Sequence, residues 1–574
     1  MKRLLVYLKD YKKECVLAPL FKMFEAVFEL IVPLVIAYMI DSGIGTGSNS
    51  VIVRSFVILI ILGITGLVVS CTAQYFAAKA ATGFSKELRH DLFKHILTFG
   101  FSEIDNIGTS TMITRMTSDV NILQSGVNMF LRLFLRSPFI VTGAMIMAFT
   151  IDVKSAMIFV LVIALLSAAV FIIMKTNIPL LKAAQRRLDD VLRLVRENLS
   201  GARVVRAFTL EEAQLSDFQN SNGSLTDMQL KAGRVSALLN PLTYVIVNLA
   251  IALLVITGDR QIETGLLTTG EVVALYNYMS QILLELIKFA NLIVTLNRSF
   301  ASAIRVNEVF DVKAQMVTTG DEAVDTDACV TAVEFDNVSL KYHEHADDAI
   351  SGISFKIQKG QTLGIIGGTG AGKTSVASLI PRFYDATEGC VKVFGNDVKK
   401  LDIADLRNNV MTVMQKAVLF EGTIRDNIKW GNPDASDEDI MEAVEAAVCS
   451  EVVKDKGGLD AHVEAGGRNF SGGQKQRLSI ARVLMAKPSI LILDDSASAL
   501  DYMTDRKLRQ NISALSYHPT VILIAQRTIS VMDCDNILVL DDGEQVGFGT
   551  HAQLLGSCEV YKEIYSSQYG KEGA

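Results

Sequence analysis

The chain has 574 residues, of which 50% are hydrophobic and 20% are charged, and its mean hydropathy is +0.33. An average soluble protein is about 25% charged and a single domain has roughly 150 residues, so we expect several domains, part of them in lipid. The net charge of −7 argues against a general attraction to nucleic acid, and the seven scattered cysteines favour neither a metal site nor a disulfide framework.

Six long apolar segments lie before residue 310. Because about 20 apolar residues cross a bilayer core, we predict membrane-spanning helices at 15–40, 51–78, 131–151, 155–178, 240–258 and 271–300. The segments 79–136 and 180–235 and the N-terminus are basic, whereas the other connections are short and poor in Lys and Arg. The basic side is expected to face the cytoplasm, which puts both chain ends there. The N-terminus shows no signal-peptide cleavage site, so we expect the mature protein to begin with this segment in the cytoplasm.

The two long basic segments contain helical patterns. The stretches "SKELRHDLFKHIL" (85–97) and "LKAAQRRLDDVLRLVRENL" (181–199) carry apolar residues at helical spacing. We expect each to continue a membrane span as one helix.

Charged residues also occur inside the apolar half. The first and sixth spans each place three polar residues on one helical face: Lys22, Glu25 and Glu29 in the first, and Glu285, Lys288 and Asn291 in the sixth. Two interpretations stay open. The residues line a substrate path, where a cation would suit Glu25 and Glu29. Otherwise they pair within each helix, Lys22 with Glu25 and Glu285 with Lys288, or lie just outside the lipid.

The composition and residue pattern of the sequence change after Val306. A polar stretch is followed, from about Val333, by short β-branched runs that alternate with helical patterns. That alternation is typical of an α/β domain with a largely parallel sheet. We therefore predict a six-helix all-α transmembrane domain at 1–314, a linker at 315–332 and an α/β P-loop nucleotide-binding domain at 333–574.

The stretch "GGTGAGKT", Gly367 to Thr374, follows the apolar run "TLGII" and matches G-x-x-x-x-G-K-[ST]. Glycines let backbone N–H groups wrap a phosphate, and the following helix adds its positive N-terminus. Lys373 is expected to reach the β- and γ-phosphates, and the Thr374 hydroxyl to hold Mg²⁺. The alternative is a glycine-rich turn without a ligand. The later apolar run "SILILDD" favours the phosphate loop, because its Asp494 can hold the same Mg²⁺ ion.

Between these two motifs lies "NFSGGQKQRLSIARVL", from Asn469 onward, and here the chain resembles the ATP-binding cassette (ABC) family of exporters. The resemblance implies that a signature turn, which alone could equally be a helix N-cap, clamps the γ-phosphate of an ATP held by another subunit. It also implies ATP and Mg²⁺ as cofactors. The expected signature residues are Ser471, Gly472, Gly473 and Gln474.

The other site residues follow from the same resemblance. Tyr342 is expected to stack on adenine, Gln415 to touch Mg²⁺, and "SALD", Ser498 to Asp501, to cross the dimer seam. The expected nucleotide-binding residues are Tyr342, Gly367, Gly368, Thr369, Gly370, Ala371, Gly372, Lys373, Thr374, Ser375 and Gln415; those expected at the metal are Thr374, Gln415 and Asp494. The stretches "FSEIDNIGTSTMITRMTSDV" and "RENLSGARVVRAFTLEEAQLSDF" resemble the two coupling segments of six-helix exporters.

The sequence departs from the family at the hydrolytic residues. Competent members carry Glu after the strand Asp and His further along, but here these positions are Asp495 and Gln526. An Asp carboxylate ends one C–C bond, about 1.5 Å, short of a Glu. A misplacement of about 1 Å can cost a reaction on the order of 100-fold. Gln526 cannot take up a proton as imidazole does. The run "HVEAGG" also has Ala465 where Glu is usual.

We therefore expect one half of a heterodimeric exporter, in which this chain's own site binds ATP but hydrolyses it poorly. Its signature would complete the site of a dissimilar half-transporter. We expect a multi-pass protein of a bacterial cell membrane, with lipid and an unidentified substrate as further partners and no nucleic acid. Alternatives are a homodimeric exporter with weak ATPase activity, a nucleotide-binding regulatory membrane subunit, and a soluble cassette ATPase acting on nucleic acid or ribosomes.

Overall fold

The structure is a computed structural model, and it describes residues 3–313, 320, 322–326, 329–343, 347–496, 498 and 500–569. The chain forms two compact units. Unit 1 comprises Met1–Leu97 and Thr109–Val312, and unit 2 comprises Thr98–Gly108 and Lys313–Ala574. Much of the predicted linker 315–332 lies outside the described residues.

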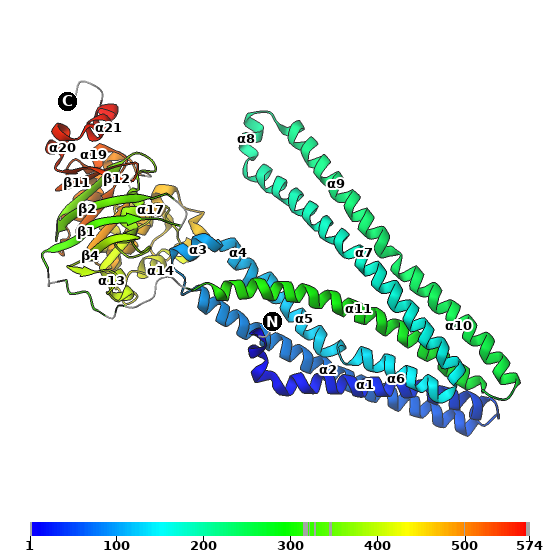
Figure 1. Cartoon of the computed structure of the whole chain (residues 1–574). Helices are drawn as coiled ribbons and strands as arrows, with labels where there is room; N and C mark the ends of the chain where they lie inside the picture. Colours follow the sequence, from blue (N-terminus) through cyan, green and yellow to red (C-terminus); the bar gives the residue numbers. More distant parts are fainter. Residues whose placement is uncertain are drawn as a thin grey trace. The chain divides into compact units, whose positions relative to one another are not determined.

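Unit 1 is entirely helical over its described residues (Figure 1). Its helices are η1 (Leu4–Tyr11), α1 (Lys12–Tyr38), η2 (Met39–Ile44), α2 (Asn49–Ile96), α4 (Thr109–Thr114), η3 (Arg115–Asp119), α5 (Val120–Leu133), α6 (Arg136–Ile151), α7 (Val153–Ser200), α8 (Ala202–Ala207), α9 (Glu211–Ala237), α10 (Leu239–Glu263) and α11 (Thr269–Asp311). Among the described residues, six continuous helical stretches are long and apolar enough to cross a membrane. They contain the six predicted spans, which confirms the expected fold of this half.

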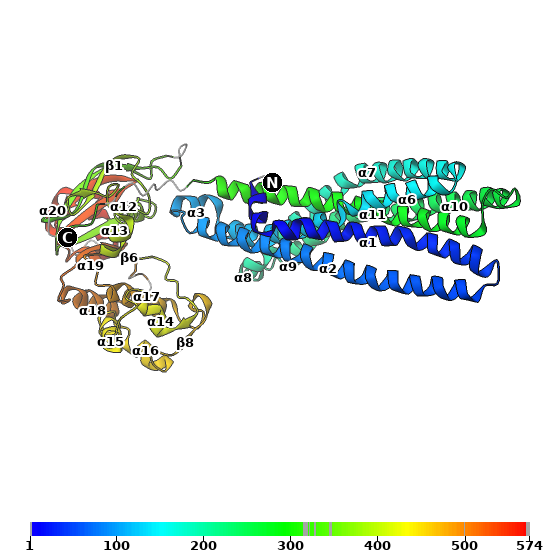
Figure 2. The same cartoon turned by 90° about the horizontal axis from the view of Figure 1, so that it is seen from below.

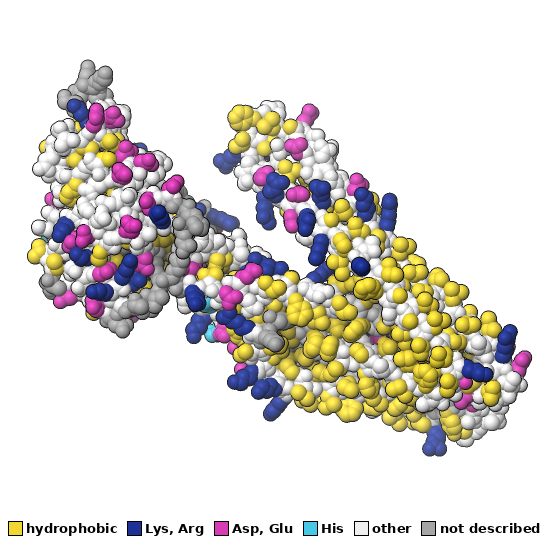
Figure 3. Space-filling model, in the orientation of Figure 1, with side chains coloured by type: hydrophobic (Ala, Val, Ile, Leu, Met, Phe, Trp, Pro, Cys, Tyr) yellow, Lys and Arg dark blue, Asp and Glu magenta, His cyan; other side chains and the backbone are white. Residues whose placement is uncertain are grey.

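The helices α2 and α7 continue well past the apolar segments. Each has 48 residues. At about 1.5 Å per residue each is roughly 70 Å long, more than twice the roughly 30 Å core of a bilayer. The stretches 85–97 and 181–199 lie almost entirely within them, as expected. On the face shown in Figure 3, hydrophobic side chains cover most of the long helices, while Lys and Arg gather towards helix ends.

A two-helix arm stands out in unit 1. Helices α7 and α9 pack against each other along their length and are joined by the short helix α8 at the tip (Figure 1). No residue of α8 is buried. The arm therefore presents its tip to solvent or to another molecule.

Unit 2 combines a mixed sheet with helices. Its strands are β1 (Thr331–Leu340), β2 (Ile350–Gln358), β3 (Thr362–Gly367), β4 (Glu388–Val393), β5 (Asn396–Asp397), β6 (Val410–Val413), β7 (Gly422–Thr423), β8 (His462–Val463), β9 (Ile490–Asp494), β10 (Thr520–Ile524), β11 (Asn536–Asp541) and β12 (Glu544–Gly549). Its helices are α3 (Phe101–Ile107), α12 (Lys373–Leu379), α13 (Ile403–Asn409), α14 (Ile424–Lys429), α15 (Asp437–Ala446), α16 (Ser450–Lys456), η4 (Ala465–Gly467), α17 (Gly472–Met485), α18 (Tyr502–Ser513), α19 (Thr528–Val531), α20 (His551–Ser557) and α21 (Glu559–Tyr569).

The order of the main sheet brings the predicted motifs together. Over the described residues it runs β5-β4-β1-β2-β12-β11-β3-β10-β9-β6, and β11, β3, β10, β9 and β6 are parallel to their neighbours within that run. Ile524 of β10 lies opposite both Ile365 of β3 and Asp494 of β9. The loops after these three strands thus leave the same edge, where parallel sheets bind ligands.

The strands that end at this edge are apolar and buried. Strands β9 and β10 are buried along their whole length, as expected for central strands covered on both faces. Helices α14 to α17 form a group beside the sheet, apart from α12 and α13 (Figure 2). The site therefore rests on fixed strand ends.

Candidate functional site

The loop between β3 and α12 has the backbone geometry of a phosphate cradle. Gly370 and Gly372 adopt φ of +87° and +86°, which side chains other than glycine rarely allow. A Cβ on Gly372 would lie 2.5 Å from the Ile350 side chain, so glycine is required there. A Cβ on Gly368 or Gly370 would meet nothing within 4 Å, so this side of the loop is open to a ligand.

Lys373 lies within this loop. Its Nζ donates to the carbonyl oxygens of Gly367 and Gly368, at 3.0 and 2.5 Å. Burial lowers the pKa of Lys373, and the nearby carboxylates of Asp495 and Asp494 oppose that shift. An ammonium with few charged partners in a buried loop suits the binding of a phosphate.

Thr374 and Asp494 meet at the same edge. The Thr374 hydroxyl donates to Asp494 Oδ1 at 3.1 Å, although 120 residues separate them. Burial raises the pKa of Asp494 and the charge of Asp495 adds to this, while the Thr374 hydrogen bond opposes it. A hydroxyl and a carboxylate are oxygen ligands of the kind that Mg²⁺ prefers, so these residues fit the predicted metal. A bound cation would reverse the pKa shift.

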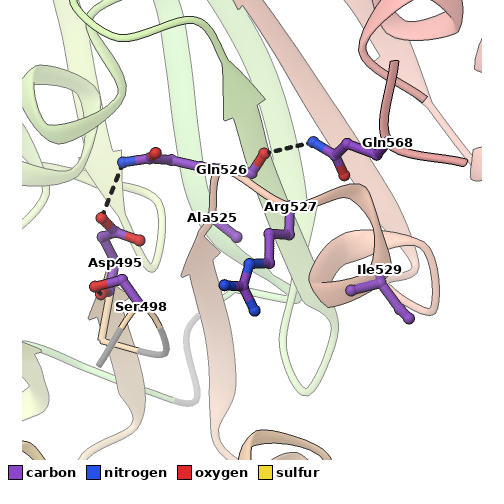
Figure 4. Close-up of a pocket in the computed structure, with 7 residues that line it drawn as sticks. All are labelled: Asp495, Ser498, Ala525, Gln526, Arg527, Ile529 and Gln568. Carbon is purple, nitrogen blue, oxygen red and sulfur yellow. Dashed lines mark hydrogen bonds between the residues drawn. The ribbon is translucent and has the colours of Figure 1, made fainter. Parts of the chain in front are cut away.

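Asp495 is held by two amides. Its Oδ2 accepts a hydrogen bond from Nε2 of Gln526 at 3.1 Å (Figure 4). It accepts a second one from Nε2 of Gln415 at 3.2 Å. Asp495 also has φ of +45°, which is uncommon outside glycine. Its backbone is fixed on both sides, because its N–H donates to the Ile524 carbonyl and its carbonyl accepts from the Ser498 hydroxyl, at 3.1 and 2.8 Å. The carboxylate that would act as a base is therefore oriented by neutral groups.

A C-terminal residue that the sequence analysis missed supports the Gln526 loop. Gln568 of α21 donates from Nε2 to the Gln526 carbonyl at 2.9 Å (Figure 4). Its Oε1 accepts from the N–H and the hydroxyl of Thr528, at 2.8 and 2.7 Å. A cavity of about 540 Å³ adjoins this loop and is lined by Asp495, Ser498, Ala525, Gln526, Arg527, Ile529 and Gln568.

The signature residues form a capped helix start away from the phosphate loop. The Gln474 N–H donates to the Ser471 hydroxyl at 3.3 Å, and the Ser471 N–H donates to Gln474 Oε1 at 3.0 Å. This capping box leaves Gly472, beside which a Cβ would meet nothing within 4 Å, on an open surface. Among the described residues no hydrogen bond joins Ser471–Gln474 to the phosphate loop.

Comparison with known proteins agrees with this geometry. Residues 15–286 match the family model of the ABC transporter transmembrane region, and residues 350–498 match the family model described as ABC transporter. The ABC transporter ATP-binding protein YfiB of Bacillus subtilis is 34% identical, with 100% of both chains covered. This chain belongs to the ABC transporter family.

Two further similarities indicate which kind of ABC transporter this chain resembles. The putative multidrug export ATP-binding/permease protein YgaD of Bacillus subtilis is 30% identical, with 99% of each chain covered. The solved structure of a bacterial Atm1-family ABC exporter with ATP bound has the same fold, with a TM-score of 0.81 and 23% identity, over 98% of this chain and 99% of that one. The transporter therefore has the exporter fold, with membrane and ATP-binding parts in one chain.

In unit 2, the predicted adenine-stacking residue Tyr342 is linked through side-chain contacts to helix α3, which lies between the second and third spans in the sequence. Tyr342 lies 2.9 Å from Ser375 Oγ through its hydroxyl, and its ring packs edge-on against Tyr384, with centroids 5.0 Å apart. The Tyr384 hydroxyl donates to Asp105 of α3 at 2.7 Å. Phe101 of the same helix stacks on Phe383 at 4.4 Å. Helix α3, the start of the first expected coupling segment, thus packs on the ATP-binding part within unit 2.

The membrane charges named in the sequence analysis are paired. Lys22 lies 2.5 Å from Glu25, and Lys288 lies 2.8 Å from Glu285, as the pairing interpretation expected. The sequence analysis missed Arg136, whose guanidinium reaches Glu285 at 2.6 Å and Glu29 at 2.8 Å. Its partners are 149 and 107 residues away, so no local pattern reveals them.

Proposed function

We propose that this chain is one half of a heterodimeric ABC exporter, and that its own phosphate loop binds Mg-ATP but hydrolyses it slowly. The observation that carries the proposal is the environment of Asp495. Its carboxylate is one carbon shorter than Glu and is held by Gln415 and Gln526. Neither amide takes up a proton, so a proton accepted by Asp495 has no onward route through them.

The rest of the site supports ATP binding. The open backbone of Gly368–Gly370 and the Lys373 ammonium suit the phosphates, and Thr374 with Asp494 suits Mg²⁺. We assign Tyr342 to the adenine and Gln415 to a position beside the metal. Bound Mg²⁺ supplies positive charge that neutralises the phosphate oxygens.

Two exposed features support a second subunit. The signature turn at Ser471–Gln474 is open and is not used by this chain's own loop. At the tip of the α7–α9 arm, Leu199, Val204 and Phe208 are 74%, 58% and 71% exposed. Apolar side chains gathered at the end of an arm are typical of a surface that another chain covers.

Export from the cytoplasm completes the proposal. The basic segments on one side of the spans favour a cytoplasmic ATP-binding part with both chain ends on the same side, in a bacterial cell membrane. YgaD carries a multidrug export name, and its coverage of the whole chain favours a similar class of small-molecule substrate. A homodimer is the second candidate, because each chain carries both a phosphate loop and a signature.

The test compares the full chain alone with the chain mixed with a dissimilar half-transporter that carries Glu and His at the positions of Asp495 and Gln526. We expect tight ATP binding but little steady-state hydrolysis alone, and vigorous hydrolysis in the mixture. Rapid turnover by the chain alone, abolished by Lys373→Ala, would overturn the heterodimer in favour of the homodimer.

A further inference from the structure

Unit 1 contains a polar cavity of about 320 Å³ among the membrane-spanning helices. Helices α1, α2, α5, α6 and α11 all contribute to its wall. It is lined by Lys22, Glu25, Ser70, Gln74, Arg132, Leu133, Arg136 and Lys288. Four of these eight side chains are cations and one is a carboxylate, which is an unusual lining for a space inside apolar helices.

The carboxylates of this region are already engaged. Glu25 lies 2.5 Å from Lys22, which also donates to the Ser70 hydroxyl at 3.1 Å. Arg136 holds Glu29 and Glu285 through its two terminal nitrogens. A cation entering the cavity would have to displace these internal partners. The structure therefore does not favour the cationic substrate that Glu25 and Glu29 suggested in the sequence.

Positive charge, in contrast, is left over. The cluster formed by the cavity's charged residues together with Glu29 and Glu285 contains four cations and three carboxylates. Arg132 has no hydrogen bond or ion pair with a described residue, and its buried Nε has no partner. Arg136 is only 6% exposed, and its Nε is also buried without a partner.

Such unpartnered donors are costly in a low-dielectric setting. A buried charge persists when it is paired, and an unpaired guanidinium next to a cavity is stabilised most by an anion. Arginine presents a planar fork of N–H donors that matches the oxygens of a carboxylate or a phosphate. Arg132 and Arg136 both line the space in which such a group would be held.

We propose that this cavity binds one anionic oxygen group, a carboxylate or a phosphate, with Arg132 as its principal contact and Lys22, Lys288 and Arg136 around it. The group belongs either to a transported amphiphile or to a lipid headgroup. The meaning of this site for transport rests on the proposed export function, but anion binding itself does not.

The test is a calorimetric titration of the purified full chain, in a non-ionic detergent, with dodecyl phosphate. We expect Arg132→Gln to weaken binding about tenfold, the usual size of one lost charge-assisted hydrogen bond. Arg132→Lys is expected to restore part of the loss because it keeps the charge. Arg298→Gln is the matched control, since Arg298 is exposed on α11 and does not line the cavity. It should leave the affinity unchanged.

The same preparations distinguish the sources of the anion. Competition by inorganic phosphate supports a soluble anionic substrate, whereas Arg132-dependent retention of phosphatidylglycerol in lipid nanodiscs supports a headgroup. Binding of ATP is measured in parallel and should be equal in all variants, which separates this site from the ATP site and shows that the variants are folded. Equal affinity of the wild type and Arg132→Gln for dodecyl phosphate would overturn the proposal, as would equally tight binding of dodecyltrimethylammonium.

Discussion

The phosphate loop and the loop after β9 leave the same edge of one sheet, yet they differ in their chemistry. Around Lys373 and Thr374 the side chains are of the kinds that suit a phosphate and Mg²⁺, and the contacts are close. At Asp495 and Gln526 the fold is equally well fixed, but the side chains lack a long carboxylate and an imidazole. The difference supports our proposal that binding and hydrolysis depend on separable parts of the edge, and that this chain keeps the first while the second is impaired.

The largest effect should come from the phosphate loop. Lys373→Ala is expected to weaken ATP binding about a hundredfold or more, because it removes the charge-assisted contacts of the only ammonium in the loop sequence Gly367–Thr374. Equilibrium binding of a fluorescent ATP analogue measures this change. Lys507→Ala is the control, since Lys507 is exposed on α18. Unchanged binding by the Lys373 variant would show that the loop is not a nucleotide site.

A smaller effect is expected at the signature once hydrolysis has been restored. In a chain carrying Asp495→Glu and Gln526→His, Ser471→Ala should lower ATP turnover about tenfold, because one hydroxyl contact to the nucleotide and the helix cap are lost. Steady-state phosphate release measures it. If turnover stays the same, the signature does not contribute to a composite site.

The contribution of Gln568 to stability can be measured separately from the contribution of the Gln526 loop to hydrolysis. Gln568→Ala removes three hydrogen bonds of an exposed side chain and is expected to destabilise the ATP-binding part by about 1 kcal/mol. Thermal unfolding measures this against Gln510→Ala, an exposed position on α18. Hydrolysis should hardly change, because the missing proton acceptor and not the loop position limits it. A large rise in hydrolysis would show that the position of the loop limits the rate of hydrolysis.

The smallest effect concerns pH. Burial raises the pKa of Asp494 above its ordinary value, so the folded state binds this proton more tightly than the unfolded state. Stability therefore falls as the pH rises from the ordinary value through the raised pKa. Asp494→Asn keeps an acceptor for Thr374 but cannot ionise, so we expect a slightly higher unfolding temperature at neutral pH in EDTA and no difference at low pH. A variant that is less stable at neutral pH would contradict this assignment.

Much of this architecture could be predicted from the sequence. Apolar length alone predicted six spans, and glycine spacing after an apolar strand predicted the loop that carries Lys373. The parallel register then brings Asp494 to Thr374, as expected for strands that end at one edge.

The contacts that were missed join residues far apart in the chain. Arg136 pairs with Glu29 and Glu285 on two other helices, and Gln568 reaches Gln526 from the last helix. Glutamine and arginine at such positions carry no local signal, because their partners are set by tertiary packing. Gln415 was expected beside Mg²⁺, and the structure shows that it also donates a hydrogen bond to Asp495. This bond was missed because it joins two loops that only tertiary packing brings together.

The most direct test of the proposed slow hydrolysis is a single-turnover experiment with radiolabelled ATP bound to the full chain. We predict that wild-type protein retains ATP largely uncleaved, and that Asp495→Glu combined with Gln526→His cleaves it about 10- to 100-fold faster. Rapid cleavage by the wild type, or no acceleration in a double variant that still binds ATP, would contradict it.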